Sequence, residues 1–204
     1  MTLSEFDNEI RKDYNVVCGC DEAGRGPLAG DVFAAAVIFD KDTVIEGIND
    51  SKKLTAKKRE ELFDEIMEKA VDFSIQTATV EEIEDINILN AAMLAMKRAV
   101  DDMDTKPDVC LIDGNKTPEG LECPAIAVVK GDAKSQAVAA ASILAKVARD
   151  RYMEQMAEQY PEYRFEKHKG YGTKLHYQMI DQYGPCGIHR MSFLKKYYAK
   201  KNGH

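Results

Sequence analysis

The sequence predicts an α/β sandwich, in which helices cover a central sheet. Short apolar segments typical of strands come early in the chain and then alternate with segments of helical periodicity, a pattern that favours this class over a helix bundle or a β-barrel. The sequence contains no internal repeat and no low-complexity tract. At 204 residues the chain is long enough to bury a substantial core in one domain, with room for a small C-terminal appendage.

The first part of the sheet is predicted from two apolar, β-branched segments, residues 16–18 and 32–39, which are joined by a glycine-rich turn at residues 24–30. Their proximity in the sequence indicates adjacent strands. A third strand is expected over residues 73–79, where the side chains alternate as they do in a half-buried strand.

Two helices are expected in the first half of the chain. Thr55 is suited to cap the first of them, and the second is expected over residues 88–103. Both carry apolar residues at helical spacing. These residues are Leu62, Phe63, Ile66, Met67 and Ala70 in the first helix, and Leu89, Met93, Met96 and Val100 in the second.

The second half of the chain continues the alternation. Residues 109–112 and 125–129 are short, strongly apolar segments just after a proline, and they are typical of buried strands. The alanine-rich segment 135–156 gives the strongest helix prediction, and its small residues indicate close packing against the sheet. A capped helix over residues 173–183 and a last helix opening at Ser192 complete the pattern.

The charge is unevenly distributed. The net charge of −7 argues mildly against a nucleic-acid ligand, but the acidic excess gathers in segments 60–68, 81–85 and 101–104. The C-terminal segment from residue 190 to residue 201 has no acid, so one face of the molecule is expected to be basic; solvated lysines on a surface helix are an equally good interpretation. Its basic residues are Arg190, Lys195, Lys196, Lys200 and Lys201.

The location of the protein is predicted from what the sequence lacks and from its cysteines. No apolar segment approaches the roughly 20 residues of a membrane span, and the N-terminus is polar. The cysteines are scattered, and the four histidines lie far downstream of Cys18 and Cys20, so we expect small buried hydrophobes rather than a zinc site. They are Cys18, Cys20, Cys110, Cys123 and Cys186. Reduced, buried thiols fit a soluble, cytoplasmic enzyme.

Acidic residues stand at the ends of three predicted strands. Asp21 and Glu22 end the first strand, Asp113 closes the segment "PDVCLID", and Asp132 follows the last strand directly before the long helix. If these ends converge, the four like charges raise one another's pKa values unless cations are present. Oxygen ligands favour Mg²⁺ or Mn²⁺, and a pair of such ions can clamp a phosphate. For Asp132 alone, capping of the helix is a serious alternative.

The glycine-rich turn is the second candidate site. Gly24, Gly26 and Gly30 permit positive φ angles and allow backbone N–H groups to approach a ligand closely. The loop has neither the GK[ST] ending of a phosphate-binding Walker loop nor a dinucleotide-binding spacing. A tight turn that merely joins two strands is the alternative interpretation.

Six motifs in order resemble those of ribonuclease HII, and the resemblance spans roughly residues 15–190. They are "DEAGRGPLAG" (21–30), "DSKKL" (50–54), "DGN" (113–115), "KGDAKS" (130–135), "AAASILAKVARDR" (139–151) and "HKGYGT" (168–173). Single motifs are short, but six in order are highly specific. One departure is Asp31, where family members often have proline or an apolar residue; it is expected to affect local strand packing and not to bind metal.

The resemblance implies an RNase H-like fold with a mixed central sheet flanked by helices. Residues 1–160 are then the catalytic domain, and residues 161–204 are a helical extension packed on it. It also implies that Mg²⁺ or Mn²⁺ is bound by four catalytic carboxylates, which are those of Asp21, Glu22, Asp113 and Asp132.

The resemblance further implies the contacts with substrate. Gly24, Arg25 and Gly26 would recognise the ribose 2′-hydroxyl, largely through backbone groups, because this hydroxyl is what distinguishes RNA from DNA at one nucleotide. Tyr171 would pack on the sugar next to the RNA–DNA junction; a partly buried tyrosine in a turn is the alternative. Phosphates near the cut would be held by Lys52 or Lys53 together with Ser135. Asp150 is expected in a structural ion pair.

The expected function is therefore hydrolysis of the RNA strand of RNA–DNA hybrids, with incision 5′ to ribonucleotides embedded in duplex DNA. A metal-activated water would attack in line and leave a 3′-hydroxyl and a 5′-phosphate. The partners are expected to be these nucleic acids, with no membrane, and the chain is expected to be a monomer.

Three alternatives remain open at this point. A ribonuclease HIII or another two-metal nuclease of the same fold would differ in cutting at a single ribonucleotide; ribonuclease HIII typically has an extra N-terminal domain, whereas the catalytic strand begins here by residue 15. A phosphate- or nucleotide-binding module would explain the glycine loop but not the acids. A structural RNA–DNA binder would need the basic tail but no metal.

Overall fold

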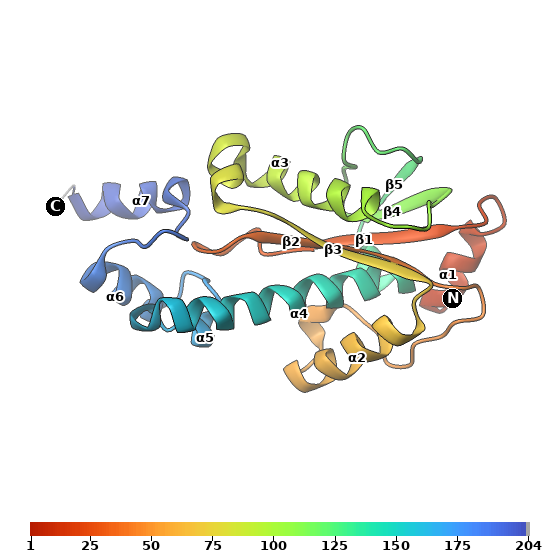
Figure 1. The fold of residues 1–204 in the computed structure, drawn as a ribbon, viewed down its shortest axis with the longest axis horizontal. Helices are drawn as coiled ribbons and strands as arrows, with labels where there is room; N and C mark the ends of the chain where they lie inside the picture. The colour runs from red at the N-terminus through yellow and green to blue at the C-terminus, as the bar shows by residue number, and fades with distance from the viewer. Residues whose placement is uncertain (203–204) are drawn as a thin grey trace.

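A single five-stranded sheet forms the middle layer of the molecule (Figure 1). The structure is a computed structural model and describes residues 1–202. Strand order is β3-β2-β1-β4-β5, with β2 antiparallel to both of its neighbours and with β1, β4 and β5 parallel to one another. The strands are β1 (Val17–Ala23), β2 (Val32–Ile38), β3 (Asp72–Ala78), β4 (Val109–Asp113) and β5 (Ala125–Val128).

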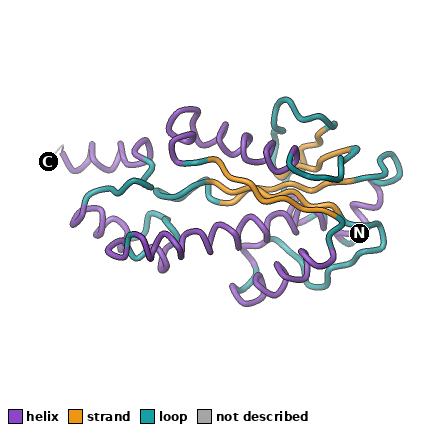
Figure 2. The backbone as a smooth tube through the Cα atoms, in the orientation of Figure 1, coloured by secondary structure: helices purple, strands orange, loops and turns teal. Residues whose placement is uncertain are grey.

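Helices cover both faces of this sheet. Figure 1 shows α3 on one side and α2 and α4 on the other, with α5 to α7 beyond one end of the sheet, and Figure 2 shows the strands enclosed between the helical layers. The predicted α/β sandwich is thereby confirmed. The helices are α1 (Leu3–Ile10), α2 (Ala56–Lys69), α3 (Val80–Asp101), α4 (Gln136–Gln159), α5 (Phe165–His168), α6 (Lys174–Tyr183) and α7 (Met191–Asn202), with 3₁₀ turns η1 (Ser51–Lys53), η2 (Gly131–Ala133) and η3 (Pro161–Tyr163).

The two faces of the sheet carry separate apolar layers because side chains alternate along each strand. Cys18, Cys20 and Cys110 are fully buried against α3, as small hydrophobes, and they are free thiols. On the opposite face, Ala35 and Val37 of β2 pack against α2 and α4. The prediction that cysteines serve the core is confirmed for these three.

Helix α4 lies unusually close to β1. A Cβ atom built on Gly19 would lie 2.2 Å from the carbonyl carbon of Ala137 and 2.3 Å from the amide nitrogen of Val138. The absence of a side chain at residue 19 therefore lets the first turn of α4 rest directly on the strand. This contact confirms the close packing predicted from the small residues of α4.

Helix caps follow the sequence signals in most places. The side chains of Thr55, Ser135 and Thr173 accept hydrogen bonds at the N-termini of α2, α4 and α6, as their residue types indicate. Helix α1, whose start is a capping box of Thr2 and Glu5, had no counterpart among the predicted elements.

The predicted start of α3 at residue 88 is wrong. The helix begins at Val80, because Thr79 and Glu82 form a capping box, and it is interrupted at Asn87, where φ is +68°. The Asn87 side chain accepts hydrogen bonds from the N–H groups of Leu89 and Asn90, so it starts the second segment as a new cap. The apolar periodicity detected only this second segment.

The prediction of a buried strand at residues 125–129 is also wrong. Strand β5 is at the edge of the sheet, so Ile126 and Ala127 are exposed, and Val129 beyond it is 56% exposed. In α2, Leu62 and Phe63 of the apolar pattern are buried, whereas Met67 is 42% exposed. Both differences arise because periodicity does not reveal which neighbours an element has.

The C-terminal helices are joined to the rest of the molecule through the loop between β1 and β2. The Leu28 N–H donates to the Gly170 carbonyl, the Gly30 N–H donates to the Ile188 carbonyl, and the Arg190 N–H donates to the Leu28 carbonyl. The predicted division at residue 160 stays a prediction. Within residues 1–202, no helix is long and apolar enough to cross a membrane.

Candidate active site

The predicted carboxylates meet at one edge of the sheet. Strands β1 and β4 are parallel neighbours, so their carboxyl ends lie side by side. Asp21 and Glu22 lie at that end of β1, and Asp113 is the last residue of β4. Asp132 lies in the turn η2, which follows β5 and precedes α4. Ligands of α/β sheets commonly bind outside the carboxyl ends of strands.

The charges of these acids act on one another. Asp21 is 5% exposed, and its pKa is raised well above the usual value, first by burial and then by the charges of Glu22 and Asp113. The pKa of Asp132 is raised by burial and then by the charges of Asp113 and Asp50. The structure thus brings all four carboxylates into one electrostatically connected group.

Backbone and side-chain donors engage several of these oxygens. One oxygen of Asp21 accepts from the Glu22 N–H at 2.7 Å, and one of Asp113 accepts from the Gly131 N–H at 2.6 Å. Glu22 pairs with Arg25 at 3.1 Å. Within residues 1–202, no three His, Cys, Asp or Glu side chains are placed so as to hold one metal ion together. The acids are neighbours rather than a formed coordination sphere.

The donor set nevertheless fits a hard cation. All four groups are carboxylates, and two of them are almost fully buried, where like charges are costly without a neutralising partner. Oxygen-only ligands select Mg²⁺ or Mn²⁺ over softer metals. The residues that would hold such ions are those predicted from the sequence.

A cavity of about 500 Å³ adjoins Glu22, one of the four acids. Its lining includes six of the predicted site residues, which are Glu22, Gly24, Arg25, Gly26, Lys52 and Tyr171. Ser142 and Lys146 of α4 also line it, and neither belongs to the site predicted from the sequence. A helix position facing a cavity carries no signal that distinguishes it from one facing solvent or core.

The glycine loop owes its shape to two different constraints. Gly24 has φ of +102°, and a Cβ there would lie 2.1 Å from Nε of Arg149. Conformation and space therefore both require glycine at residue 24. A Cβ on Gly26 would meet the Tyr171 ring at 3.8 Å, an ordinary contact, so this glycine keeps the backbone accessible to the cavity.

Tyr171 projects into the cavity from a braced turn. The residue is 43% exposed, its N–H donates to the carbonyl of His168, and its own carbonyl lies 3.0 Å from Nδ1 of His176. Nε2 of His176 lies 3.0 Å from Nε2 of His189, whose Nδ1 accepts from the Cys186 N–H. One proton arrangement satisfies this series: His189 donates to His176, which donates to the Tyr171 carbonyl.

Two predicted substrate contacts are placed differently. Ser135 is fully buried, and its hydroxyl accepts from the Val138 N–H as the cap of α4, so it is committed to the helix and we do not retain it as a phosphate contact. Because Ser135 is the cap, the alternative role of Asp132 as the helix cap is wrong. Lys53 is exposed and pairs with Asp50 at 4.0 Å, outside the cavity lining to which Lys52 belongs.

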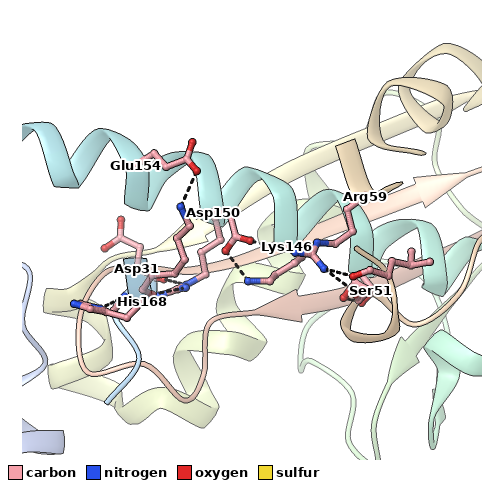
Figure 3. Close-up of polar contacts among 12 residues, drawn as sticks. Asp31, Ser51, Arg59, Lys146, Asp150, Glu154 and His168 are labelled. Atoms are coloured by element: carbon pink, nitrogen blue, oxygen red, sulfur yellow. Dashed lines mark hydrogen bonds and ion pairs between the residues drawn. The ribbon is translucent and has the colours of Figure 1, made fainter. Parts of the chain in front are cut away.

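The two remaining aspartates have structural partners. Asp150 lies between Lys146 and Arg59, at 2.6 Å and 3.9 Å, which confirms the predicted ion pair (Figure 3). Asp31 accepts from the Val80 N–H at 3.0 Å and so holds the start of α3. Its effect is local, as expected.

The basic C-terminal segment is less uniform than its sequence indicates. Lys195, Lys196 and Lys200 are exposed, but Arg190 is fully buried, so the prediction that it contributes to a basic face is wrong. Its guanidinium donates to carbonyls of the glycine loop. An arginine at the start of a lysine-rich segment is typical of a surface helix, and the sequence alone gives no sign of this internal role.

Comparison with known proteins identifies one family. A family model described as ribonuclease HII matches residues 18–196. The chain is 54% identical over 189 residues to a ribonuclease HII of Caldicellulosiruptor saccharolyticus, covering 93% of this chain and 92% of the relative. It is 58% identical over 178 residues to that of Idiomarina loihiensis, covering 87% and 95%. The crystal structure of ribonuclease H2 from Pyrococcus horikoshii superposes with a TM-score of 0.72 at 30% identity, covering 87% and 93%.

Proposed function

The chain belongs to the ribonuclease HII family of metal-dependent endonucleases, which cleave the RNA strand of RNA–DNA hybrids, and we propose that it also incises duplex DNA on the 5′ side of a single embedded ribonucleotide. The observation that carries the proposal is a group of four neighbouring carboxylates, one of which, that of Glu22, lines the same cavity as a glycine loop. One group of residues suits phosphodiester hydrolysis, and the other suits recognition of a ribose.

We assign the metal site to the four carboxylates at the strand ends. Mg²⁺ or Mn²⁺, when bound there, supplies positive charge that stabilises the phosphate's transition state and lowers the pKa of water. The four side chains that would hold it are those of Asp21, Glu22, Asp113 and Asp132. In-line attack by water then leaves a 3′-hydroxyl and a 5′-phosphate.

Other residues bind and orient the substrate. Gly24, Arg25 and Gly26 line the cavity, so backbone N–H groups of this loop suit contact with a 2′-hydroxyl, which can accept a hydrogen bond. The Tyr171 ring forms a flat apolar surface for the adjoining sugar. Lys52, which also lines the cavity, supplies positive charge for a phosphate.

The test is cleavage of duplex DNA holding one ribonucleotide, with and without EDTA. The wild-type chain is expected to cut at that nucleotide and to lose activity in EDTA. Cutting of long hybrids but not of the single ribonucleotide would favour a ribonuclease HIII-like specificity and contradict the proposal.

Two variants test the assignment of the acids. Asp21→Asn and Asp113→Asn are expected to abolish turnover with little loss of fold, because asparagine keeps an oxygen that can accept from the neighbouring N–H groups. Removal of the buried charge at residue 21 should leave the free energy of unfolding unchanged or higher. Asp64→Asn, on the exposed face of α2, is the matched control. Near wild-type activity in either site variant would refute the assignment.

A further inference from the structure

The guanidinium of Arg190 is enclosed by the glycine loop. The residue is 0% exposed, and it donates five hydrogen bonds, all of which end on backbone carbonyls of this loop. The Gly24 carbonyl accepts at 2.7 Å, that of Arg25 at 3.2 Å and that of Pro27 at 2.9 Å. The Gly30 carbonyl accepts twice, at 2.9 Å and 2.6 Å.

Burial of this charged group is unfavourable unless hydrogen bonds to the loop compensate for the lost hydration. Burial of a guanidinium removes its hydration, and here burial lowers the pKa of Arg190 to about 9, with the nearby charge of Arg149 acting in the same direction. The carbonyl dipoles repay part of that cost by saturating the planar fork of donors. The loop conformation and the buried charge therefore depend on each other.

The direction of the carbonyls fixes the direction of the N–H groups. A trans peptide holds the C=O of one residue antiparallel to the N–H of the next, and the described chain has no cis peptide. With the Gly24 and Arg25 carbonyls turned toward Arg190, the N–H groups of Arg25 and Gly26 must point away from it. Both residues line the cavity.

These two N–H groups also differ from those of Leu28 and Gly30. The Leu28 and Gly30 N–H groups donate to carbonyls of the C-terminal segments. In the part of the chain that the structure describes, the Arg25 and Gly26 N–H groups donate to no protein acceptor. The N–H groups of Gly24 and Ala29 likewise donate to no protein acceptor among the described residues, but neither follows a carbonyl that the Arg190 side chain holds. Arg25 and Gly26 therefore carry the unpaired donors of the loop whose direction Arg190 sets.

We propose that Arg190 is the positioning residue for ribonucleotide selectivity, because it holds two loop carbonyls and thereby directs the Arg25 and Gly26 N–H groups at the 2′-hydroxyl. The inference rests on the proposed function. It assigns to a residue outside the cavity lining the task of setting the donor geometry, while the loop itself contacts the sugar.

Arg149 holds the loop from the other side. It is also 0% exposed, and it donates to the carbonyls of Ala29, Asp31 and Lys169. It therefore ties the far half of the loop to α4 and the C-terminal helices. Arg190 alone of the two contacts the carbonyls that precede the free donors.

The decisive variant is Arg190→Lys, which keeps the positive charge but replaces a planar fork by a single ammonium group that cannot serve four carbonyls. The matched control is Leu62→Ala, which creates a cavity in the α2 layer, away from the loop. Both variants are expected to be less stable than the wild-type chain, but Arg190→Lys alone should change the direction of the Arg25 and Gly26 N–H groups.

The measurement is a selectivity ratio, which does not depend on the fraction of active enzyme. The ratio is the Kd of an all-DNA duplex divided by the Kd of the same duplex with one ribonucleotide, both measured in Ca²⁺. In addition, kcat/KM is measured for the ribonucleotide duplex in Mg²⁺. For Arg190→Lys we expect the ratio of the two Kd values to fall about tenfold and kcat/KM to fall at least as much, about 1.4 kcal/mol per tenfold. Leu62→Ala should keep the wild-type ratio.

A folded Arg190→Lys variant with the wild-type ratio would overturn the inference and leave the proposed function intact. A wild-type chain that shows no preference for the ribonucleotide would instead overturn the proposed function. If Arg190→Lys does not fold, amide NMR of the wild-type chain decides. The Arg25 and Gly26 N–H signals are expected to shift with the ribonucleotide duplex and not with the all-DNA duplex, and equal shifts with both would overturn the inference.

Discussion

Replacement of Gly19 by alanine tests how closely α4 is seated on the catalytic strand. The added Cβ would lie 2.2 Å, 2.3 Å and 2.6 Å from three backbone atoms of Ala137 and Val138. None of these atoms can rotate away as a side chain would. The helix must therefore shift by about 1 Å or more to restore ordinary van der Waals separation.

The expected cost follows from two opposing terms. Overpacking of a rigid interior typically destabilises by about 1–3 kcal/mol, and contact with backbone places this site at the upper end. Removal of a glycine from a strand interior returns about 0.5–1 kcal/mol through the lower entropy of the unfolded chain. The free energy of unfolding of Gly19→Ala should therefore be about 2 kcal/mol lower than that of the wild-type chain.

The assay is urea unfolding followed by circular dichroism, together with cleavage of the single-ribonucleotide duplex. Gly187→Ala is the matched control, because a Cβ there meets only the Tyr160 hydroxyl, at 3.5 Å, and should change stability by less than about 0.5 kcal/mol. Activity of Gly19→Ala should also fall, because Asp21 lies two residues along the strand and Asp132 precedes the displaced helix. An unchanged urea midpoint would refute the reasoning.

Two further predictions concern the turn that carries Tyr171. Burial lowers the pKa of His176 and His189 to about 4, below the usual 6.5, so the unfolded chain takes up protons before the folded chain does. The free energy of unfolding should therefore fall by up to about 2 kcal/mol per histidine as the pH falls from 6.5 to 5. A free energy of unfolding that stays constant over this range, in a pH series of urea melts, would contradict the prediction. Tyr171→Ala should lower kcat/KM about tenfold to a hundredfold, because it removes the stacking surface. Tyr171→Phe should keep kcat/KM near the wild-type value. Equal losses of kcat/KM in both variants would assign the effect to the hydroxyl instead.

Local signals in the sequence account for the elements that were predicted correctly. The alanines of α4 and the apolar run of β2 report directly on burial, and Thr55 and Thr173 report on helix starts because a cap is a contact within four residues. The four acids could be proposed as a site because a carboxylate at the end of an apolar strand requires an explanation from the sequence alone.

The features that escaped prediction depend on contacts between distant residues. The exposure of β5 depends on its place at the sheet edge, which the alternation of strands and helices does not fix. The role of Ser135 depends on which of two nearby polar residues caps α4. Arg190 is 160 to 166 residues from the carbonyls that its side chain holds, and Met191 and Ser192 directly after it are exposed. No local pattern contains that information.

The net negative charge of the chain bears on why the loop offers uncharged N–H donors to the substrate. A protein with net charge −7 that binds a polyanion needs local positive charge for affinity, and such contacts do not distinguish RNA from DNA. Backbone N–H groups add selectivity without adding charge, but they work only if their direction is fixed. In this chain a buried guanidinium fixes that direction from behind the loop, so its charge organises the site without attracting phosphates. Selectivity and affinity can then be altered separately, at Arg190 and at exposed lysines such as Lys52.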